Sequence, residues 1–172
     1  MAKIAFIVDD MFEDSEFQVP YERVEEAGHE PVIVGLDAGK KIKGKKGDVT
    51  TTTEVAARDV DAAEFAALVI PGGYSPDKIR TDRAMVGLTK SLFDAGKPVA
   101  AICHAGWMLV EADVVRGKTV TSWPSIKTDL VNAGAEWVDQ EVVEDGNLIT
   151  SRKPDDLEAF TKTLLSQVEQ QS

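Results

Sequence analysis

The sequence has 172 residues, 43% of them hydrophobic, and a formal net charge of -11 at pH 7. These values suit one domain, residues 1–172, and exclude a membrane protein, because no stretch reaches the roughly 18 apolar residues that span a bilayer. The negative charge disfavours nucleic acid and anionic membranes as partners. A single cysteine forms no internal disulfide and no targeting segment is visible, so we expect a cytoplasmic protein.

Short apolar runs alternate with amphipathic segments, which predicts an α/β fold with a mostly parallel sheet and helices on both faces. Pro20 lies inside the first expected helix and predicts a kink or a separate first turn there. Strands are expected at 3–8, 30–36, 65–73, 98–103 and 118–122, with hairpins at 40–53 and 141–151. Helices are expected at 15–27, 82–95, 104–112, 124–133 and 155–169.

Three polar segments follow the first, third and fourth of the core strands. Their sequences are DDMFEDSE, PGGYSPDK and CHAGW. In open parallel sheets, ligands bind outside the carboxyl ends of the strands. We therefore expect these segments to converge at one edge of the sheet and to form a site.

Cys103 stands where a buried strand is expected to give way to a helix. A sharp turn at this point exposes the side chain, as in the nucleophile elbow of hydrolases. The helix N-terminus is expected to lower the thiol pKa and to leave the N–H groups of His104 and Ala105 free for an oxyanion. The alternative is a buried, inert cysteine. The position favours a nucleophile.

His104 is the candidate base, because His29 is expected at the opposite, amino end of the sheet. The alternative is that His104 begins a helix and has no catalytic role. Glu13 is expected to approach the Cys103 sulfur and to share a proton with it. Three further carboxylates compete for acidic roles: Asp14, Glu16 and Asp77. The alternative role for Asp14 is a helix N-cap, and Asp77 could orient an imidazole.

The glycine pair Gly72 and Gly73 fits a turn whose backbone N–H groups meet a ligand oxygen. One cysteine and two histidines, expected at opposite ends of the sheet, form no transition-metal cluster. No glycine-rich phosphate fingerprint follows the first strand. The sequence therefore predicts no metal, nucleotide or flavin cofactor.

The sequence resembles the ThiJ/PfpI family, in particular its PfpI-type intracellular peptidase branch, along nearly its whole length. The resemblance is carried by FEDSEF, EEAGHEPVIV, ALVIPGGYSPDKIR, GKPVAAICHAGWML and RGKTVTSWPSIKTDLVNAGAEWVDQEVVEDGNLITSRKPDDL. It implies a flavodoxin-like three-layer sandwich, related to class I glutamine amidotransferases. It also implies Cys103 as the nucleophile, His104 beside it and Glu13 as the acid against the sulfur.

Two positions depart from the family pattern. Asp77 stands where the PfpI branch has a glutamate that reaches the histidine of a neighbouring subunit, and its side chain is one methylene shorter. HAGW replaces the HGP of PfpI peptidases, so Trp107 is expected to narrow the pocket against large peptides. Trp123 is expected either to line the same pocket or to pack in the core. The resemblance further implies homodimers, and hexamers that are trimers of dimers.

Two functions stay open from the sequence. The first is a stress-response enzyme, a peptidase-like hydrolase or a glyoxalase/deglycase, whose Cys103 attacks a small carbonyl or peptide substrate. The second is a redox sensor or protective protein without turnover, in which the same thiol is oxidised. A glutamine amidotransferase is disfavoured, because that chemistry needs a downstream histidine and none follows His104.

Overall fold

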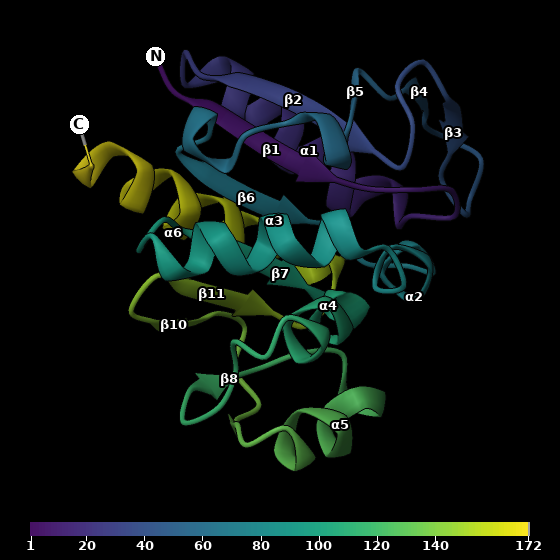
Figure 1. Ribbon diagram of the computed structural model, residues 1–172. Coiled ribbons are helices and arrows are strands. Elements are labelled where there is room, and N and C mark those ends of the chain that lie inside the picture. The colour runs from purple at the N-terminus through teal and green to yellow at the C-terminus, as the bar shows by residue number, and fades with distance from the viewer. Residues whose placement is uncertain (172) are drawn as a thin grey trace.

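The chain folds around a seven-stranded sheet, seen in a computed structural model that describes residues 1–171 (Figure 1). The antiparallel pair at one edge surrounds the turn at Gly146, and the other neighbours pair in parallel. This confirms the mostly parallel sheet and the 141–151 hairpin. The strand order is β10 (Val143–Asp145), β11 (Leu148–Ser151), β7 (Val99–Ile102), β6 (Ala67–Ile70), β1 (Lys3–Ile7), β2 (Glu30–Gly35) and β5 (Val55–Ala56).

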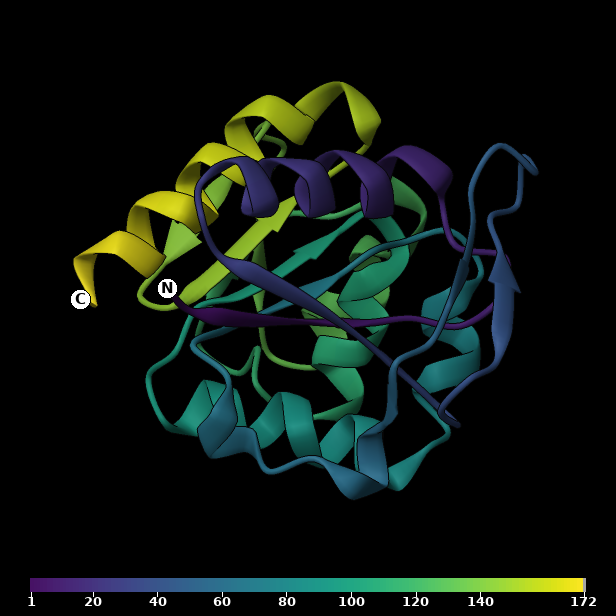
Figure 2. The same ribbon diagram turned by 90° about the horizontal axis from the view of Figure 1, so that it is seen from above.

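Helices cover both faces of the sheet. Ile4 and Phe6 of β1 pack into one apolar cluster, and Ala5 and Ile7 pack into the other. Successive side chains of a strand point to opposite faces, so a sheet covered on both sides is apolar on both. Seen from above (Figure 2), α1 (Asp14–Glu26) and α6 (Leu157–Gln170) lie side by side on one face, and α3 (Arg83–Asp94) lies on the other. This is the predicted three-layer arrangement.

Two small strand pairs stand outside the main sheet. The antiparallel ribbon β3 (Lys41–Lys43) and β4 (Thr50–Thr52) confirms the hairpin expected at 40–53. β8 (Thr119–Val120) pairs in parallel with β9 (Glu136–Trp137), a strand that the sequence pattern did not predict. α5 (Lys127–Asn132) connects these two strands.

Two helices differ from the predictions. α1 runs through Pro20, so the first turn is not separate: the buried proline ring forgoes one backbone hydrogen bond, and the helix continues around it. The segment after the glycine pair, expected as a loop, contains the short helix α2 (Ser75–Ile79).

Short 3-10 turns occur at several joints, and one of them carries Cys103. The helix expected at 104–112 begins as such a turn and continues as α4 (Gly106–Glu111). None of the helices in residues 1–171 is both long and apolar enough to cross a membrane. The 3-10 turns are Ala57–Asp59, Ala62–Glu64, Cys103–Ala105, Pro124–Ile126 and Pro154–Asp156.

Candidate active site

Cys103 occupies a sharp turn directly after β7. Its φ angle is 63°, a left-handed conformation that non-glycine residues rarely adopt. Such a backbone costs on the order of 1–3 kcal/mol and is found mostly at functional sites. The Cys103 Sγ lies 3.3 Å from Nδ1 of His104, and the residue is 8% exposed. The turn therefore places the sulfur against a base, as a nucleophile elbow does.

The glycine pair after β6 packs directly against this cysteine. A Cβ at Gly72 would lie 2.8 Å from the Cys103 Cβ, so only glycine fits there. Gly73 has a φ of 80° and forms an isolated β-bridge with Phe12. Hydrogen bonds from the backbone N–H groups of His104 and Gly73 lower the thiol pKa, which shows that both point at the sulfur. They are the candidate oxyanion donors.

Ala105 was the other expected oxyanion donor. Its side chain is fully buried in the core. Its backbone N–H as an oxyanion donor remains a prediction.

The carboxyl group against the cysteine belongs to Glu16, not to Glu13. Glu16 is fully buried, and its Oε1 accepts a hydrogen bond of 2.9 Å from the N–H of Gly72. Burial raises the pKa of Glu16 to about 8, and its side chain interacts with Cys103. Glu16 therefore stays largely protonated at neutral pH and can both give and take a proton.

The thiol pKa is raised, which contradicts the expected lowering by a helix N-terminus. Burial and then the charge of Glu16 raise the pKa of Cys103 to about 12. The physical reason is that the first turn after the cysteine is a buried 3-10 turn, in which desolvation outweighs the backbone N–H groups. Protonated Glu16 carries no charge, so the proton on Glu16 removes this obstacle to forming the thiolate.

Glu13 lies one turn away and serves a different contact. Its carboxylate pairs with Nζ of Lys45 at 2.8 Å and with Nζ of Lys46 at 3.0 Å. Its negative charge contributes to the raised pKa of Glu16. The expected contact between Glu13 and the sulfur is therefore replaced by one from Glu16, because α1 begins at Asp14 and turns position 16 toward the sheet.

Asp14 is not the helix N-cap that the sequence suggested; Glu13 holds that position. The Asp14 carboxylate instead accepts backbone N–H groups of Lys46, Asp48 and Val49 at 2.9–3.0 Å. Burial alone would raise the pKa of Asp14, but these hydrogen bonds lower it overall. The contacts fix the loop between β3 and β4 beside the site.

His104 is half-buried between two tryptophans. The ring centroids of Trp107 and Trp123 lie 5.1 and 6.2 Å from its own, and Trp123 is 39% exposed, so it lines the site rather than the core. Nε2 of His104 lies 3.3 Å from Oγ of Ser125. Burial and then the charge of Lys45 lower the pKa of His104 below 6.5. The ring is therefore neutral at pH 7, and Nδ1 can accept the thiol proton.

Asp77 does not reach this histidine within the chain. It is exposed on α2 and lines an open groove of about 870 Å³ with Arg80, Arg83 and Glu111 among others. No carboxylate contacts His104 in the described part of the chain. The structure thus brings Cys103, His104 and the glycine pair together and leaves Asp77 apart.

Sequence reasoning did not single out three groups near His104 and Cys103. Ser125 bonds the imidazole, Asp129 accepts a 2.9 Å hydrogen bond from Nε1 of Trp107, and Lys45 acts on the site through its charge. They come from the β3–β4 loop and from the segment after β8, whose paths the strand pattern does not define. Among the described residues, no cluster of three His, Cys, Asp or Glu side chains fits a metal ion.

Comparison with known proteins identifies the family of this chain. The sequence model of the DJ-1/PfpI family matches residues 2–167. Protein/nucleic acid deglycase 2 of Escherichia coli (strain K12) is 48% identical over 164 residues, 95% of each chain. General stress protein 18 of Bacillus subtilis (strain 168) is 43% identical over 168 residues, 97% of this chain and 98% of that one.

A solved structure shows the same fold. A two-domain protein of Anabaena variabilis, with DJ-1/ThiJ/PfpI-like and ferritin-like domains, has a TM-score of 0.97 and 41% identity over 98% of this chain and 48% of its own. The sheet and the strained cysteine turn define the class, an α/β protein with a nucleophile elbow. The chain belongs to the DJ-1/PfpI family.

Proposed function

We propose that this protein is a cysteine-dependent enzyme of the glyoxalase/deglycase type, which acts on small carbonyl compounds and their adducts. One observation carries the proposal: the Cys103 sulfur is held by a strained turn against both the imidazole of His104 and the carboxyl of Glu16. The name of the Escherichia coli relative, a protein/nucleic acid deglycase, supports the same class of chemistry.

The first step is addition of the thiol to an aldehyde carbonyl. Nδ1 of neutral His104 accepts the thiol proton while the Cys103 sulfur bonds to the carbonyl carbon. The backbone N–H groups of Gly73 and His104 stabilise the oxygen that gains negative charge. The protonated His104 returns this proton to the oxygen, which gives a neutral hemithioacetal with no change of oxidation state.

The second step moves a proton between the two carbons of an α-oxoaldehyde. The carboxylate form of Glu16, a minority at neutral pH, removes the C–H proton of the hemithioacetal and returns it to the neighbouring carbon. The hydroxyl proton passes to the neighbouring oxygen, which yields a thioester of Cys103. A pKa of about 8 suits the carboxyl for both directions of transfer near neutral pH. Water then hydrolyses the thioester, releasing a 2-hydroxy acid and the free thiol.

Peptide hydrolysis receives less support from the same residues. A cysteine peptidase orients its histidine with an acid or amide partner. In the described chain, Nε2 of His104 meets only the hydroxyl of Ser125, and Asp77 is exposed on α2. We therefore favour the glyoxalase/deglycase activity over peptide hydrolysis.

A homodimer, or a hexamer made of such dimers, is part of this proposal because the family resemblance implies it. In such an assembly Asp77 of one subunit is the residue to approach His104 of another. Sedimentation velocity of the wild type and of Asp77→Asn, read together with peptide turnover, tests this point. A monomeric wild type whose peptide turnover equals that of Asp77→Asn would contradict it.

The experiment that tests the function compares Cys103→Ser, Glu16→Gln and His104→Gln with the wild type. Methylglyoxal consumption, formation of lactate and release of N-acetyl-arginine from its methylglyoxal adduct are measured beside cleavage of a fluorogenic peptide. His29→Gln is the matched control, because His29 contacts the backbone N–H of Ala2 at the amino end of the sheet. We expect loss of turnover in the site variants only. Turnover that persists in Cys103→Ser would refute the proposal.

A further inference from the structure

We propose that Lys45 and Lys46 form an anion-binding site beside Cys103, which selects carbonyl substrates that carry a carboxylate or phosphate group. The inference rests on the proposed function, since it names the substrate class of the same site. It is carried by the ion pairs around Glu13 and by the contacts that hold Lys45 near the cysteine.

Two ammonium groups share a single carboxylate at this point. Lys45 and Lys46 both pair with Glu13, at 2.8 and 3.0 Å. The Glu13 side chain is only 6% exposed, whereas those of Lys45 and Lys46 are 32% and 59% exposed. One carboxylate balances one of the two cations, so the pair offers an unbalanced positive charge to the solvent. Charge-assisted hydrogen bonds from ammonium groups are a common way to hold carboxylates and phosphates.

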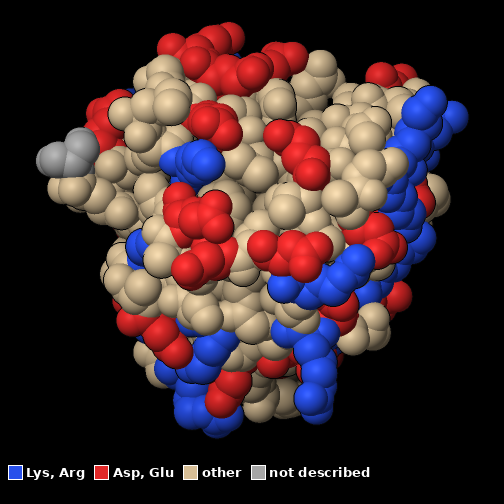
Figure 3. Space-filling model, turned by 45° about the horizontal axis from the view of Figure 1, so that its top comes forward, with Lys and Arg blue, Asp and Glu red and all other residues tan. Residues whose placement is uncertain are grey.

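Two other carboxylates of this region are engaged elsewhere. Both oxygens of Asp14 accept backbone N–H groups of the loop that carries the two lysines. Asp10 accepts the N–H of Lys43 at 2.9 Å. In a chain with a net charge of -11, basic side chains nevertheless gather along the edge where β3 and β4 lie (Figure 3). A run of basic side chains therefore lies along this edge of an acidic protein.

A short series of contacts links Lys45 to the thiol. The N–H of Glu13 donates to the carbonyl of Gly72, which packs against Cys103. Nζ of Lys45 lies 5.7 Å from the ring centroid of Tyr74, the residue that follows the oxyanion turn and is 60% exposed. The Lys45 charge also lowers the pKa of both Cys103 and His104. The ammonium thus lies within electrostatic reach of the reacting sulfur.

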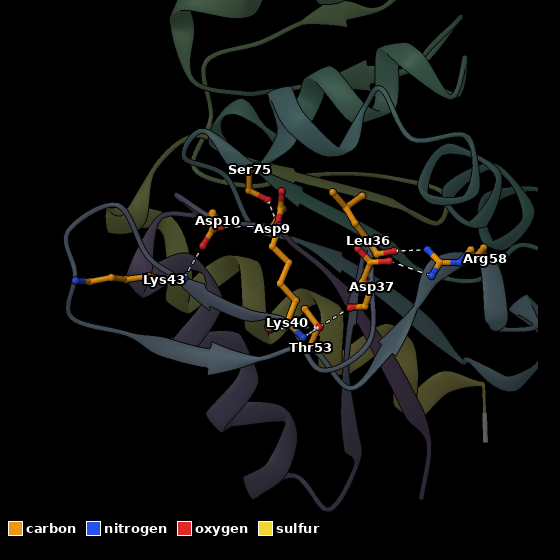
Figure 4. A network of polar contacts seen from close by, with 9 residues as sticks. All are labelled: Asp9, Asp10, Leu36, Asp37, Lys40, Lys43, Thr53, Arg58 and Ser75. Atoms are coloured by element: carbon orange, nitrogen blue, oxygen red, sulfur yellow. Dashed lines mark hydrogen bonds and ion pairs between the residues drawn. The ribbon is translucent and has the colours of Figure 1, made fainter.

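The loop that carries the lysines is fixed before any substrate arrives. The N–H of Lys45 donates to the carbonyl of Phe12 at 2.8 Å, and Ile42 of β3 is fully buried. Figure 4 shows Lys40 reaching Asp9, which anchors the start of the ribbon with an ion pair of 2.8 Å, while Lys43 points away from this network. A pre-formed site loses little conformational entropy on binding. The anion site is therefore part of the resting structure.

This arrangement gives a substrate two points of attachment. Its anionic group binds the ammonium groups of the two lysines, and its carbonyl carbon lies next to the Cys103 sulfur. The exposed ring of Tyr74 supplies a flat surface between them. An α-oxoaldehyde with a carboxylate or phosphate on its chain satisfies both points, whereas a neutral one satisfies only the second.

Alkylation of Cys103 by two reagents that differ in charge tests the inference without turnover. Iodoacetate transfers a carboxymethyl group to the sulfur, iodoacetamide transfers a carbamidomethyl group, and each releases iodide. The rate ratio of the two reagents cancels any change in the thiolate fraction. We expect this ratio to fall about three- to tenfold in Lys45→Met/Lys46→Met, as one or two lost charges near an exposed site predict. Lys45→Arg should retain it, and Glu13→Gln should raise it.

Lys41→Met and Lys43→Met are the matched controls, because both side chains are exposed on the same ribbon and neither forms an ion pair among the described residues. An unchanged ratio in the double variant, or an equal fall in the controls, would overturn the inference. Protection of Cys103 by acetate or by inorganic phosphate at constant ionic strength decides between carboxylate and phosphate; protection by neither also counts against it. A wild-type cysteine inert to both reagents would instead contradict the proposed function.

Discussion

The carboxyl of Glu16 and the thiol of Cys103 face each other across the backbone of Gly72. The N–H of Gly72 donates to Oε1 of Glu16 at 2.9 Å, and a Cβ at this glycine would lie 2.5 Å from that oxygen. The two acidic groups therefore share one small, dry space, in which each controls the protonation of the other. Burial in this space is the main cause of both raised pKa values, and the charge of Glu16 raises the pKa of Cys103 further.

Gly72→Ala is predicted to damage both stability and reactivity. The added methyl group meets the Glu16 carboxyl, the Cys103 Cβ and the carbonyl of Ile102, all under 3 Å. We expect a loss of about 1–3 kcal/mol in the free energy of unfolding and slower alkylation of Cys103. Urea denaturation and iodoacetamide kinetics measure these effects. Gly87→Ala is the control: it lies exposed in α3 with open space around it, and should gain about 0.5–1 kcal/mol.

Glu16→Gln is predicted to remove a pH dependence of stability. Burial raises the pKa of Glu16 from 4.5 to about 8, so between these values the folded protein binds a proton that the unfolded chain has lost. The wild type therefore loses stability as the pH rises from about 4.5 to about 8, and the variant lacks this loss. We expect the stability difference between the two proteins to change by about 1–4 kcal/mol across the window. A stability difference between wild type and Glu16→Gln that is the same at pH 5 and pH 8 would contradict the raised pKa.

Asp14→Asn is predicted to loosen the loop that carries Lys45 and Lys46. The carboxylate holds three backbone N–H groups, and its lost acceptor strength should cost about 1–3 kcal/mol at pH 7. The pKa of Asp14 is lowered in the folded state, so the cost is present above 3.8 and disappears as the pH falls through the lowered value. Hydrogen exchange of these three amides should become faster. Asp48→Asn changes the same charge on an exposed side chain of the same loop and should leave the exchange unchanged.

His104 is predicted to titrate below 6.5. Burial and the Lys45 charge both lower its pKa, and Lys45→Met should therefore move the midpoint upward. The Cε1 proton resonance of His104, followed by NMR against pH, gives both midpoints. A wild-type midpoint above neutral pH would show a positively charged imidazole at the start of the reaction, which is inconsistent with its role as the acceptor of the thiol proton.

Much of the fold follows from local sequence patterns. Apolar runs give the core strands, and Gly146 marks the hairpin between β10 and β11. Strands that are only two residues long, such as β9, carry no such pattern. Pro20 does not separate the first turn of α1, which runs through the proline, and the predicted kink stays a prediction.

The site was predictable in its location and only partly in its residues. The strand-end rule brought the Gly72–Gly73 turn and Cys103 together correctly. It did not distinguish Glu13 from Glu16, because the choice depends on the residue at which α1 begins. The direction of the thiol pKa was also wrong, since the extent of burial around Cys103 depends on packing that no local pattern reveals.

The central claim is that Cys103 bonds covalently to the substrate and that Glu16 then moves the proton. Mass spectrometry of the protein during reaction with methylglyoxal tests it most directly. We predict one substrate molecule attached to the peptide that carries Cys103, transient in the wild type, accumulating in Glu16→Gln and absent from Cys103→Ser. Lactate formation by Cys103→Ser, or turnover by the wild type with no adduct on this peptide, would contradict the account.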